Sequence, residues 1–283
     1  MIGQVYKAHS NAYYVKSDGK LHKCGARGVL KIKGESISVG DYVKVEKGVI
    51  FEVAKRKNRF IRPNVSNVDV IVAVVSPEPK PDLLLVDKLL ISAIKEGADF
   101  IIAVNKSDVD DGLVSEIKKE YENLPVRIIE VCAKSMKGVA ELKEMLKGNL
   151  AVLAGQSAVG KTSLINAMFN LNQKVGDLSE KIQRGKHTTT RSEIFEVGEY
   201  KIVDSPGFAV IEAFVSADEI SEYYPDYFEV SSKCKFRGCK HVNEPDCQVK
   251  RLVLDGKLSK TRYERYLQIY DEISKRREIY EKN

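Results

Sequence analysis

The sequence predicts a multidomain protein with a small N-terminal β-barrel, a central α/β domain on a parallel sheet, and a C-terminal, mostly helical region. Three observations support this. Short strand-like runs fill roughly the first 60 residues, continuous β-branched runs then alternate with helical periodicity, and three cysteines and a histidine fall within the fourteen residues 234–247. We expect domains at residues 1–66, 67–220 and 221–283.

The composition is that of an ordinary globular chain. Of 283 residues, 43% are hydrophobic and 30% are charged, which excludes a disordered or collagen-like chain. The apolar run Val70–Val75 is far shorter than the ~20 residues that span a bilayer. The first residues lack a basic-then-apolar signal pattern. We therefore expect a cytoplasmic monomer that does not enter a membrane.

The first region has the pattern of a small barrel. Asp41–Glu46 alternates with period two, and Gly48–Val53 follows after a short turn. Several short strands of this kind fit an OB-fold, and an SH3-like barrel fits equally well.

The barrel region is also basic. Residues 1–62 carry 14 basic and 5 acidic side chains, a net charge of +9 (14 minus 5). A basic surface can simply keep a protein soluble, but packed cations beside Phe60 suit a phosphate backbone with a stacked base. The predicted RNA-binding residues are Lys55, Arg56, Lys57 and Arg59.

The central region alternates strands and helices with short connections, so we expect a parallel sheet covered by helices, with function at the carboxyl ends of its strands. The expected strands are Val70–Val75, Phe100–Val104, Val126–Val131, Leu150–Leu153 and Tyr200–Val203, and the expected helices are Leu83–Lys95, Leu113–Tyr121 and Val139–Lys147.

A phosphate-binding loop follows the strand Leu150–Leu153 and opens a helix. The pattern G-x-x-x-x-G-K-T at 155–162 turns successive N–H groups and a helix N-terminus toward phosphates. Lys161 is expected to bridge the β- and γ-phosphates and Thr162 to bind Mg²⁺. The whole predicted loop comprises Gly155, Gln156, Ser157, Ala158, Val159, Gly160, Lys161, Thr162 and Ser163.

A second phosphate motif, Asp-Ser-Pro-Gly at 204–207, follows the strand Tyr200–Val203. We expect Asp204 to hold Mg²⁺, through water, and the Gly207 N–H to meet the γ-phosphate.

Two further strand ends predict a guanine site. Asp108 of Asn105-Lys106-Ser107-Asp108 offers a carboxylate to the paired N1–H and N2–H donors of guanine, which adenine lacks, so GTP is favoured over ATP. Asn105 is expected to tie this loop to the phosphate loop, and Lys106 to lie against the ring. From Cys132-Ala133-Lys134, the Ala133 N–H is expected at guanine O6.

The order of the motifs indicates a circular permutation. The base motifs precede the phosphate motifs, whereas an ordinary GTPase has the reverse order. The segment after Gly207 leads straight into the C-terminal region, so we expect nucleotide state to bias how that region sits.

The cysteine-rich cluster predicts a zinc site. Cys234, Cys239, His241 and Cys247 offer three sulfurs and one imidazole, which suit one structural, tetrahedral Zn²⁺. The alternative is a cluster of free thiols. Cys24 and Cys132 have no partners in the sequence and are expected to be packing or surface residues.

A basic helix is expected at Leu258–Tyr280. Its apolar stripe is predicted to be a packing face, with RNA stacking as the alternative; the stripe consists of Tyr263, Tyr266, Leu267, Tyr270 and Ile273. The basic side chains either contact phosphate or form a solvated face; they are Lys250, Arg251, Lys260, Arg262, Arg265, Lys275, Arg276 and Arg277.

Together these motifs resemble the bacterial circularly permuted GTPases known as ribosome small-subunit-dependent GTPase A. The resemblance covers essentially the whole chain and includes the His-Thr-Thr-Thr segment at 187–190. It implies an N-terminal OB-fold, a central permuted GTPase and a zinc domain. It also implies GTP hydrolysis stimulated by the small ribosomal subunit, binding to its RNA, and a role in its late maturation. Two departures are Ala158 in the phosphate loop and Cys132 where serine is common; because the guanine contact comes from backbone, the second puts little in doubt.

Hydrolysis is expected to be slow without a partner. Ras-like enzymes position water with a glutamine just after the D-x-x-G motif, and here that position is Phe208. His187 is the nearest candidate catalytic residue, although it also fits an ordinary exposed loop residue. Thr189 and Thr190 are candidate Mg²⁺ ligands. The alternatives are an RNA-binding module in which GTP is a conformational ligand with little turnover, and an ATP-dependent RNA-binding enzyme.

Overall fold

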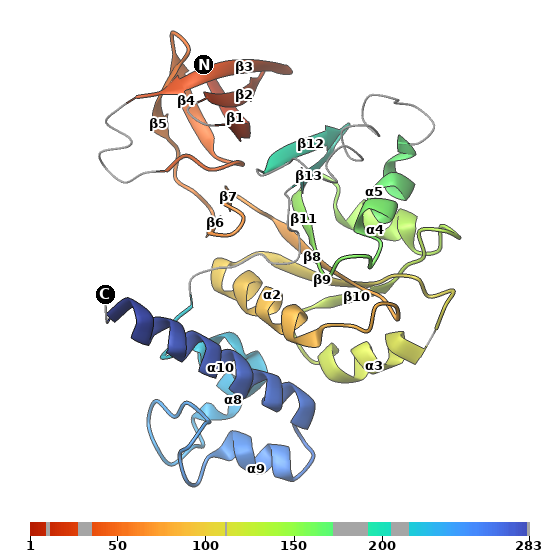
Figure 1. Cartoon of the computed structure of the whole chain (residues 1–283), viewed down its shortest axis with the longest axis vertical. Coiled ribbons are helices and arrows are strands. Elements are labelled where there is room, and N and C mark those ends of the chain that lie inside the picture. Colours follow the sequence, from red (N-terminus) through yellow and green to blue (C-terminus); the bar gives the residue numbers. More distant parts are fainter. Residues whose placement is uncertain (10–11, 28–35, 111, 172–191, 205–214, 282–283) are drawn as a thin grey trace.

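The computed structural model describes residues 1–9, 12–27, 36–110, 112–171, 192–204 and 215–281. The barrel and the C-terminal region lie at opposite ends of the long axis, with the α/β domain between them (Figure 1). Within the described ranges, no helix combines the length and apolar character needed to cross a membrane.

The N-terminal barrel closes with the strand order of an OB-fold. Its strands pair in the order β1-β2-β3-β5-β4, and β4 returns to pair with β1. The β3–β5 pair is parallel and the others are antiparallel, which decides for an OB-fold over the SH3-like alternative. The strands are β1 (Ile2–His9), β2 (Ala12–Ser17), β3 (Lys20–Ala26), β4 (Tyr42–Glu46) and β5 (Val49–Val53).

The barrel core is small and apolar. In β4 alternate residues point inward, so that Val43 and Val45 are buried while Tyr42 and Lys44 are exposed. Cys24 is also buried in this core, as expected of a packing residue.

A short hairpin, β6 (Arg59–Phe60) and β7 (Val65–Ser66), leads into the central domain. Phe60 and Val65 are fully buried and belong to the core of the central sheet. The linker therefore also anchors the barrel.

The central sheet is parallel except at one edge. Its order is β10-β9-β8-β11-β13-β12, and only β12 runs antiparallel to its neighbour β13. The strands are β8 (Val70–Val75), β9 (Asp99–Val104), β10 (Arg127–Glu130), β11 (Leu150–Ala154), β12 (Glu193–Val197) and β13 (Tyr200–Asp204). The sequence analysis did not predict β12.

Helices cover both faces of this sheet because its strands are apolar on both sides. Ile71, Ala73 and Val75 share a core with α2 (Leu83–Glu96) and α3 (Gly112–Tyr121). The intervening valines of β8 face the other core, which is formed with α4 (Val139–Met145) and α5 (Lys161–Phe169). The expected parallel sheet with helices on it is confirmed.

The barrel continues the central sheet. β1 pairs with the edge strand β12, with Lys7 opposite Glu193, so barrel and central domain form one sheet of eleven strands. Side chains reinforce this junction. Lys7 bonds Glu193 at 2.5 Å, and Glu196 accepts bonds from Lys16 and Tyr6.

The C-terminal region is helical and packs on α2. Its elements are η1 (Ile220–Tyr223), α8 (Pro225–Ser231), α9 (Gln248–Leu254) and α10 (Lys260–Glu281). Tyr266 of α10 is fully buried, and Tyr263, Leu267, Tyr270 and Ile273 pack against the same core. The predicted packing face of this helix is confirmed.

Arg262 and Arg265 of α10 are ion-paired within the protein. The sequence analysis expected the basic side chains of this helix either to contact phosphate or to form a solvated face, and for these two both expectations are wrong. Arg265 bonds Asp87 of α2 at 2.5 Å and Glu120 of α3 at 2.8 Å. Arg262 is 2% exposed and bonds Asp226 at 2.5 Å. They form a buried ion network that joins α10 to the central domain. The side chains of Arg276 and Arg277 lie outside the described part of the chain.

Candidate nucleotide-binding site and metal centre

A pocket of about 580 Å³ lies where three segments distant in sequence meet. One segment follows β9, one follows β10, and the third is the loop between β11 and α5 with the first turns of α5. Its walls are formed by Asn105, Lys106, Asp108, Val109, Cys132, Ala133, Lys134, Met136, Gly160, Ser163, Asn166, Ala167 and Asn170. The sequence analysis did not single out Asn166 of α5 or Asn170, the C-cap of that helix, and both line the pocket.

Asn105 joins the three segments. Its Nδ2 donates to the Val159 carbonyl at 2.9 Å, and its Oδ1 accepts from the Ala133 N–H at 3.2 Å. The side chain is almost completely buried, at 1% exposure. The expected tie between the first segment and the phosphate loop is therefore present. The Ala133 N–H, expected at guanine O6, bonds Asn105 in this structure.

Asp108 stands at the rim of the pocket with its carboxylate held in place. The Cys132 thiol donates to its Oδ1 at 3.3 Å, and Lys134 Nζ lies 3.7 Å from its Oδ2. The thiol bond lowers the pKa of Asp108, and the charge of Lys134 acts in the same direction. The side chain of Cys132 thus contacts the predicted base-reading carboxylate, whereas the sequence analysis assigned a role only to the backbone of this segment.

Lys106 and Ser107 support the same loop. Lys106 adopts a left-handed backbone (φ 60°), and its Nζ donates to the Glu78 carbonyl at 2.6 Å. At the end of β10, hydrogen bonds first from Lys137 and then from Ser107 lower the pKa of the Glu130 carboxyl. These bonds hold the loop against the neighbouring strand end.

The phosphate loop needs its two glycines for physical reasons. A Cβ on Gly155 would lie 2.3 Å from the Val74 carbonyl, and one on Gly160 would lie 2.3 Å from Asn105 Nδ2. Both residues also have positive φ, at 136° and 95°. Ala158 has a left-handed φ of 66°, where glycine is preferred, so the departure noted in the sequence carries backbone strain.

Lys161 begins α5 and points back over the loop. Its Nζ donates to the carbonyls of Gly155 at 2.6 Å and Gln156 at 2.5 Å. Burial lowers the pKa of Lys161 to about 8, because the two neutral carbonyls replace water only in part. Ser157, Thr162 and Ser163 are exposed at the same mouth. A polyanion bound here would contact both the Lys161 ammonium group and the N-terminus of α5.

The remaining predicted site residues fall at or beyond the described boundary. Asp204 ends β13, opposite Glu193 of β12, and its side chain is not described. Outside the described residues lie His187, Thr189, Thr190, Gly207 and Phe208.

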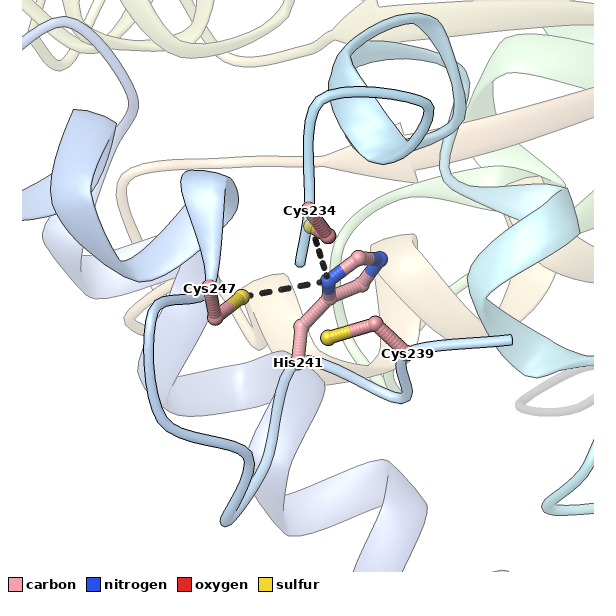
Figure 2. Close-up of side chains that lie close together, drawn as sticks. All are labelled: Cys234, Cys239, His241 and Cys247. Carbon is pink, nitrogen blue, oxygen red and sulfur yellow. Dashed lines mark hydrogen bonds between the residues drawn. The ribbon is translucent and has the colours of Figure 1, made fainter. Parts of the chain in front are cut away.

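Cys234, Cys239, His241 and Cys247 come together between α8 and α9 (Figure 2). Their ligand atoms all lie within 4.8 Å of one another. His241 is fully buried, and its Nδ1 lies 3.3 Å from the Cys247 sulfur and 3.7 Å from the Cys234 sulfur. Sulfurs around tetrahedral zinc stand roughly 3.8 Å apart, so this group fits the ion.

The electrostatics of the cluster also fit a cation. Burial raises the pKa of Cys239 to about 12 and raises that of Cys247, while burial lowers the pKa of His241. Three thiols beside a neutral imidazole form thiolates readily only when a metal ion compensates their charge. Tyr263 and Tyr266 of α10 donate to the carbonyls of His241 and Lys240, which anchors the cluster to the helix.

The basic cluster after the barrel is partly engaged within the protein. Arg56 bonds both oxygens of the buried Asp41, at 2.7 and 2.8 Å, and so has a structural role. Lys57 pairs with Asp69 at 2.9 Å, and Arg59 donates to Ser36 at 2.5 Å. Lys55 is exposed.

Comparison with known proteins gives consistent matches. Residues 53–214 match the family model described as RsgA GTPase, and residues 2–49 match the RsgA N-terminal domain. Proteins named small ribosomal subunit biogenesis GTPase RsgA are similar over nearly their whole length. The one from Geobacillus sp. (strain WCH70) is 37% identical, covering 98% of this chain and 99% of the relative, and the one from Clostridium acetobutylicum is 38% identical, with the same coverage.

Solved structures agree. The crystal structure of YjeQ from Thermotoga maritima superposes with a TM-score of 0.79 at 33% identity, covering 96% of this chain and 98% of that chain. The structure of YloQ, titled a circularly permuted GTPase, gives 0.76 at 29% identity, covering 97% and 95%. The permuted order of the motifs is thus shared with a protein of known fold.

Proposed function

The chain belongs to the RsgA GTPase family, and from this premise we propose that it hydrolyses GTP to GDP and phosphate in the biogenesis of the small ribosomal subunit. Its curated relatives carry that function in their names. The observation that supports the proposal most directly is the pocket in which Asn105 ties together the segments of Asp108, Ala133 and Val159.

Guanine recognition rests on Asp108. Its carboxylate would accept the N1–H and N2–H donors of the base, which adenine does not offer as a pair. The bonds from Cys132 and Lys134 keep it ionised and oriented. The aliphatic part of Lys106 would cover one face of the ring, and the Ala133 N–H would bind O6 by sharing or exchanging its bond to Asn105.

The triphosphate would lie over residues 155–163. Lys161 would release the carbonyls of Gly155 and Gln156 and move to the β- and γ-phosphates. Thr162 and Asp204 would hold Mg²⁺, together with Thr189 or Thr190, and Gly207 would bind the γ-phosphate. The bound Mg²⁺ would neutralise charge that develops on the phosphate oxygens.

Turnover would depend on the ribosomal partner. No glutamine follows the Asp-Ser-Pro-Gly motif, because Phe208 stands there, so positioning of water would fall to His187 or to the partner. We assign release from the small subunit to hydrolysis, since loss of the γ-phosphate removes the contacts that order the phosphate-sensing segments.

The cysteine cluster would hold one structural Zn²⁺, with all four coordination positions filled by protein. Such a site contributes on the order of 10 kcal/mol to folding, which suits a region with a small core. The barrel and this region would contact ribosomal RNA, with Lys55, Lys57 and Arg59 at the barrel side, while Arg56 keeps its bonds to Asp41. We assign a cytoplasmic monomer.

The test is GTP turnover by the purified, zinc-loaded protein with and without purified small subunits. Slow basal turnover that rises on adding subunits supports the proposal. A subunit effect that is absent favours the alternative in which GTP is only a conformational ligand. His187→Ala distinguishes the catalytic candidate, because an unchanged stimulated rate excludes it.

A further inference from the structure

Two exposed phenylalanines of the C-terminal region have opposite surroundings. Phe236 is 43% exposed and Phe228 is 59% exposed, although a large apolar side chain is usually covered. Phe236 lies in the stretch 230–243, which contains Lys233, Lys235, Arg237 and Lys240 and no acidic residue. Phe228, by contrast, lies between Asp226 and Glu229. One aromatic ring thus stands in a basic stretch and the other beside carboxylates.

The backbone around Phe236 is fixed. Residues 233–239, which we call the basic knuckle, run from α8 to the second cysteine of the cluster. The Cys239 N–H donates to the Phe236 carbonyl at 3.3 Å, and Gly238 has the positive φ (73°) that this turn requires. Cys234 and Cys239 hold the two ends at the cysteine cluster. The ring is therefore presented on a rigid turn, at little entropic cost for binding.

The cations of the knuckle remain accessible. Lys235 pairs with Asp246 at 2.8 Å, but both side chains are more than 60% exposed, so this ion pair is weak and open to exchange. Lys235 Nζ also lies 5.8 Å from the centre of the Phe236 ring. Lys233 and Arg237, which precede and follow Phe236 in the sequence, are also exposed. One cation thus lies over the exposed aromatic ring, and two further exposed cations lie within three residues of it in the chain.

We propose that the basic knuckle binds an unpaired base of RNA, with Phe236 stacking on the base and Arg237 and Lys235 contacting the flanking phosphates. An exposed aromatic ring among cations is the arrangement that single-stranded nucleic acid needs. An apolar protein partner would favour Phe228 as much as Phe236, and nothing in such a contact requires the cations. The inference rests on the proposed function, because it names the surface of this region that meets ribosomal RNA.

The test uses the full-length, zinc-loaded protein with a non-hydrolysable GTP analogue and two probes. These are purified small ribosomal subunits and a fluorescent oligouridylate of about ten nucleotides. Phe236→Ala is expected to weaken binding to both probes about tenfold, as for loss of one stacked base. Phe236→Leu is expected to weaken it as much, and Phe236→Tyr to retain it. Arg237→Ala is expected to lower the slope of log affinity against log salt by about one, which Phe236→Ala leaves unchanged.

The matched control is Phe228→Ala, which removes an even more exposed ring and is expected to bind like the unmodified protein. Zinc content and melting temperature are measured for every variant, so that loss of the fold is recognised. Unchanged binding by Phe236→Ala overturns the inference, and so does full binding by Phe236→Leu, which would indicate an apolar protein contact. If the protein does not bind small subunits but Phe236→Ala still weakens oligouridylate binding, the proposed function is wrong, whereas the inference that the basic knuckle binds RNA is supported.

Discussion

The barrel and the C-terminal region are attached to the central domain by charged contacts of different kinds. At the C-terminal junction, Asp87 is completely buried and Arg262 is 2% exposed. At the barrel junction, the side chains of Lys7 and Glu193 are 46% and 31% exposed, and those of Lys16 and Glu196 are 28% and 22% exposed. Buried charges must stay paired, whereas solvent can replace the partners of exposed ones.

The two junctions also reach different halves of the nucleotide site. The C-terminal region contacts α2 and α3, and α3 follows Asp108 in the chain. The barrel contacts β12, which lies in sequence between the threonines at 188–190 and Asp204. The C-terminal region is thus fixed to the base-recognition half and the barrel to the phosphate-recognition half. The sequence analysis expected nucleotide state to act on the C-terminal region; these contacts predict a larger response in the barrel.

The largest expected effect is at the buried junction. Asp87→Ala removes the partner that Arg262 and Arg265 share, and it is expected to lower the free energy of unfolding by about 3–5 kcal/mol, measured in urea. Glu272→Ala is the control, because it breaks the partly exposed pair with Lys88 at the same interface and should cost under about 1 kcal/mol. Equal losses for the two variants would contradict the distinction between buried and exposed ion pairs on which the comparison of the junctions rests.

Next in size is a pH effect on the phosphate half. Lys161 loses its proton above pH 8 in the free protein, whereas a bound triphosphate raises its pKa, so binding takes up a proton. GTP affinity is therefore expected to be constant below about pH 7, to be about half as high at pH 8, and to be about tenfold lower than the plateau at pH 9. Calorimetry in two buffers with different ionisation enthalpies checks this uptake. Lys161→Arg, which does not titrate there, should bind more weakly but lose most of the pH dependence.

A smaller effect is expected at the barrel junction. Glu196→Ala removes the acceptor for Lys16 and Tyr6 and should cost about 1 kcal/mol of stability at low salt. Because these groups are partly exposed, the cost is expected to shrink in 1 M salt, where the Debye length is about 3 Å. Urea unfolding at two salt concentrations measures both values. A loss of stability as large as that of Asp87→Ala, or a loss that does not change with salt concentration, contradicts the distinction between the buried and the exposed junction.

The smallest expected effect is on the base half. Cys132→Ala removes the thiol bond to Asp108 and should weaken GTP binding about threefold to tenfold, the worth of one hydrogen bond. Cys132→Ser, whose hydroxyl donates better, should bind at least as well as the unmodified protein. ITP, which lacks the N2 amine, should lose less affinity than GTP in Cys132→Ala. An equal loss for both nucleotides would mean that the thiol does not orient the carboxylate.

Much of this architecture follows from local sequence. The run Val70–Val75 predicts its strand with the observed bounds because a strand buried on both faces has to be apolar throughout. The four zinc-ligand candidates are equally local, since they fall within fourteen residues. The phosphate loop is recognised because its glycines meet backbone demands that no other residue meets. The domain boundaries and the roles of the site residues stay predictions.

Features that depend on distant partners were not predictable in this way. The choice of an OB-fold follows from the parallel pairing of β3 with β5, which no local pattern encodes. In the sequence, Arg265 is only one of several basic residues in a helix. Its structural role depends on its contact with Asp87, 178 residues away, which the local pattern does not reveal. Likewise, β12 carries two glutamates in five residues, and only the lysines of the barrel explain them.

The central claim is that Asp108 selects guanine in a pocket built from a permuted chain. It is tested most directly by equilibrium binding of labelled GTP, ATP and xanthosine triphosphate to the zinc-loaded protein and to Asp108→Asn. The account predicts that the unmodified protein retains GTP and not ATP, and that the variant exchanges GTP for xanthosine triphosphate, whose ring presents an acceptor where guanine has its amine. Equal retention of GTP and ATP, or unchanged GTP binding by the variant, contradicts it.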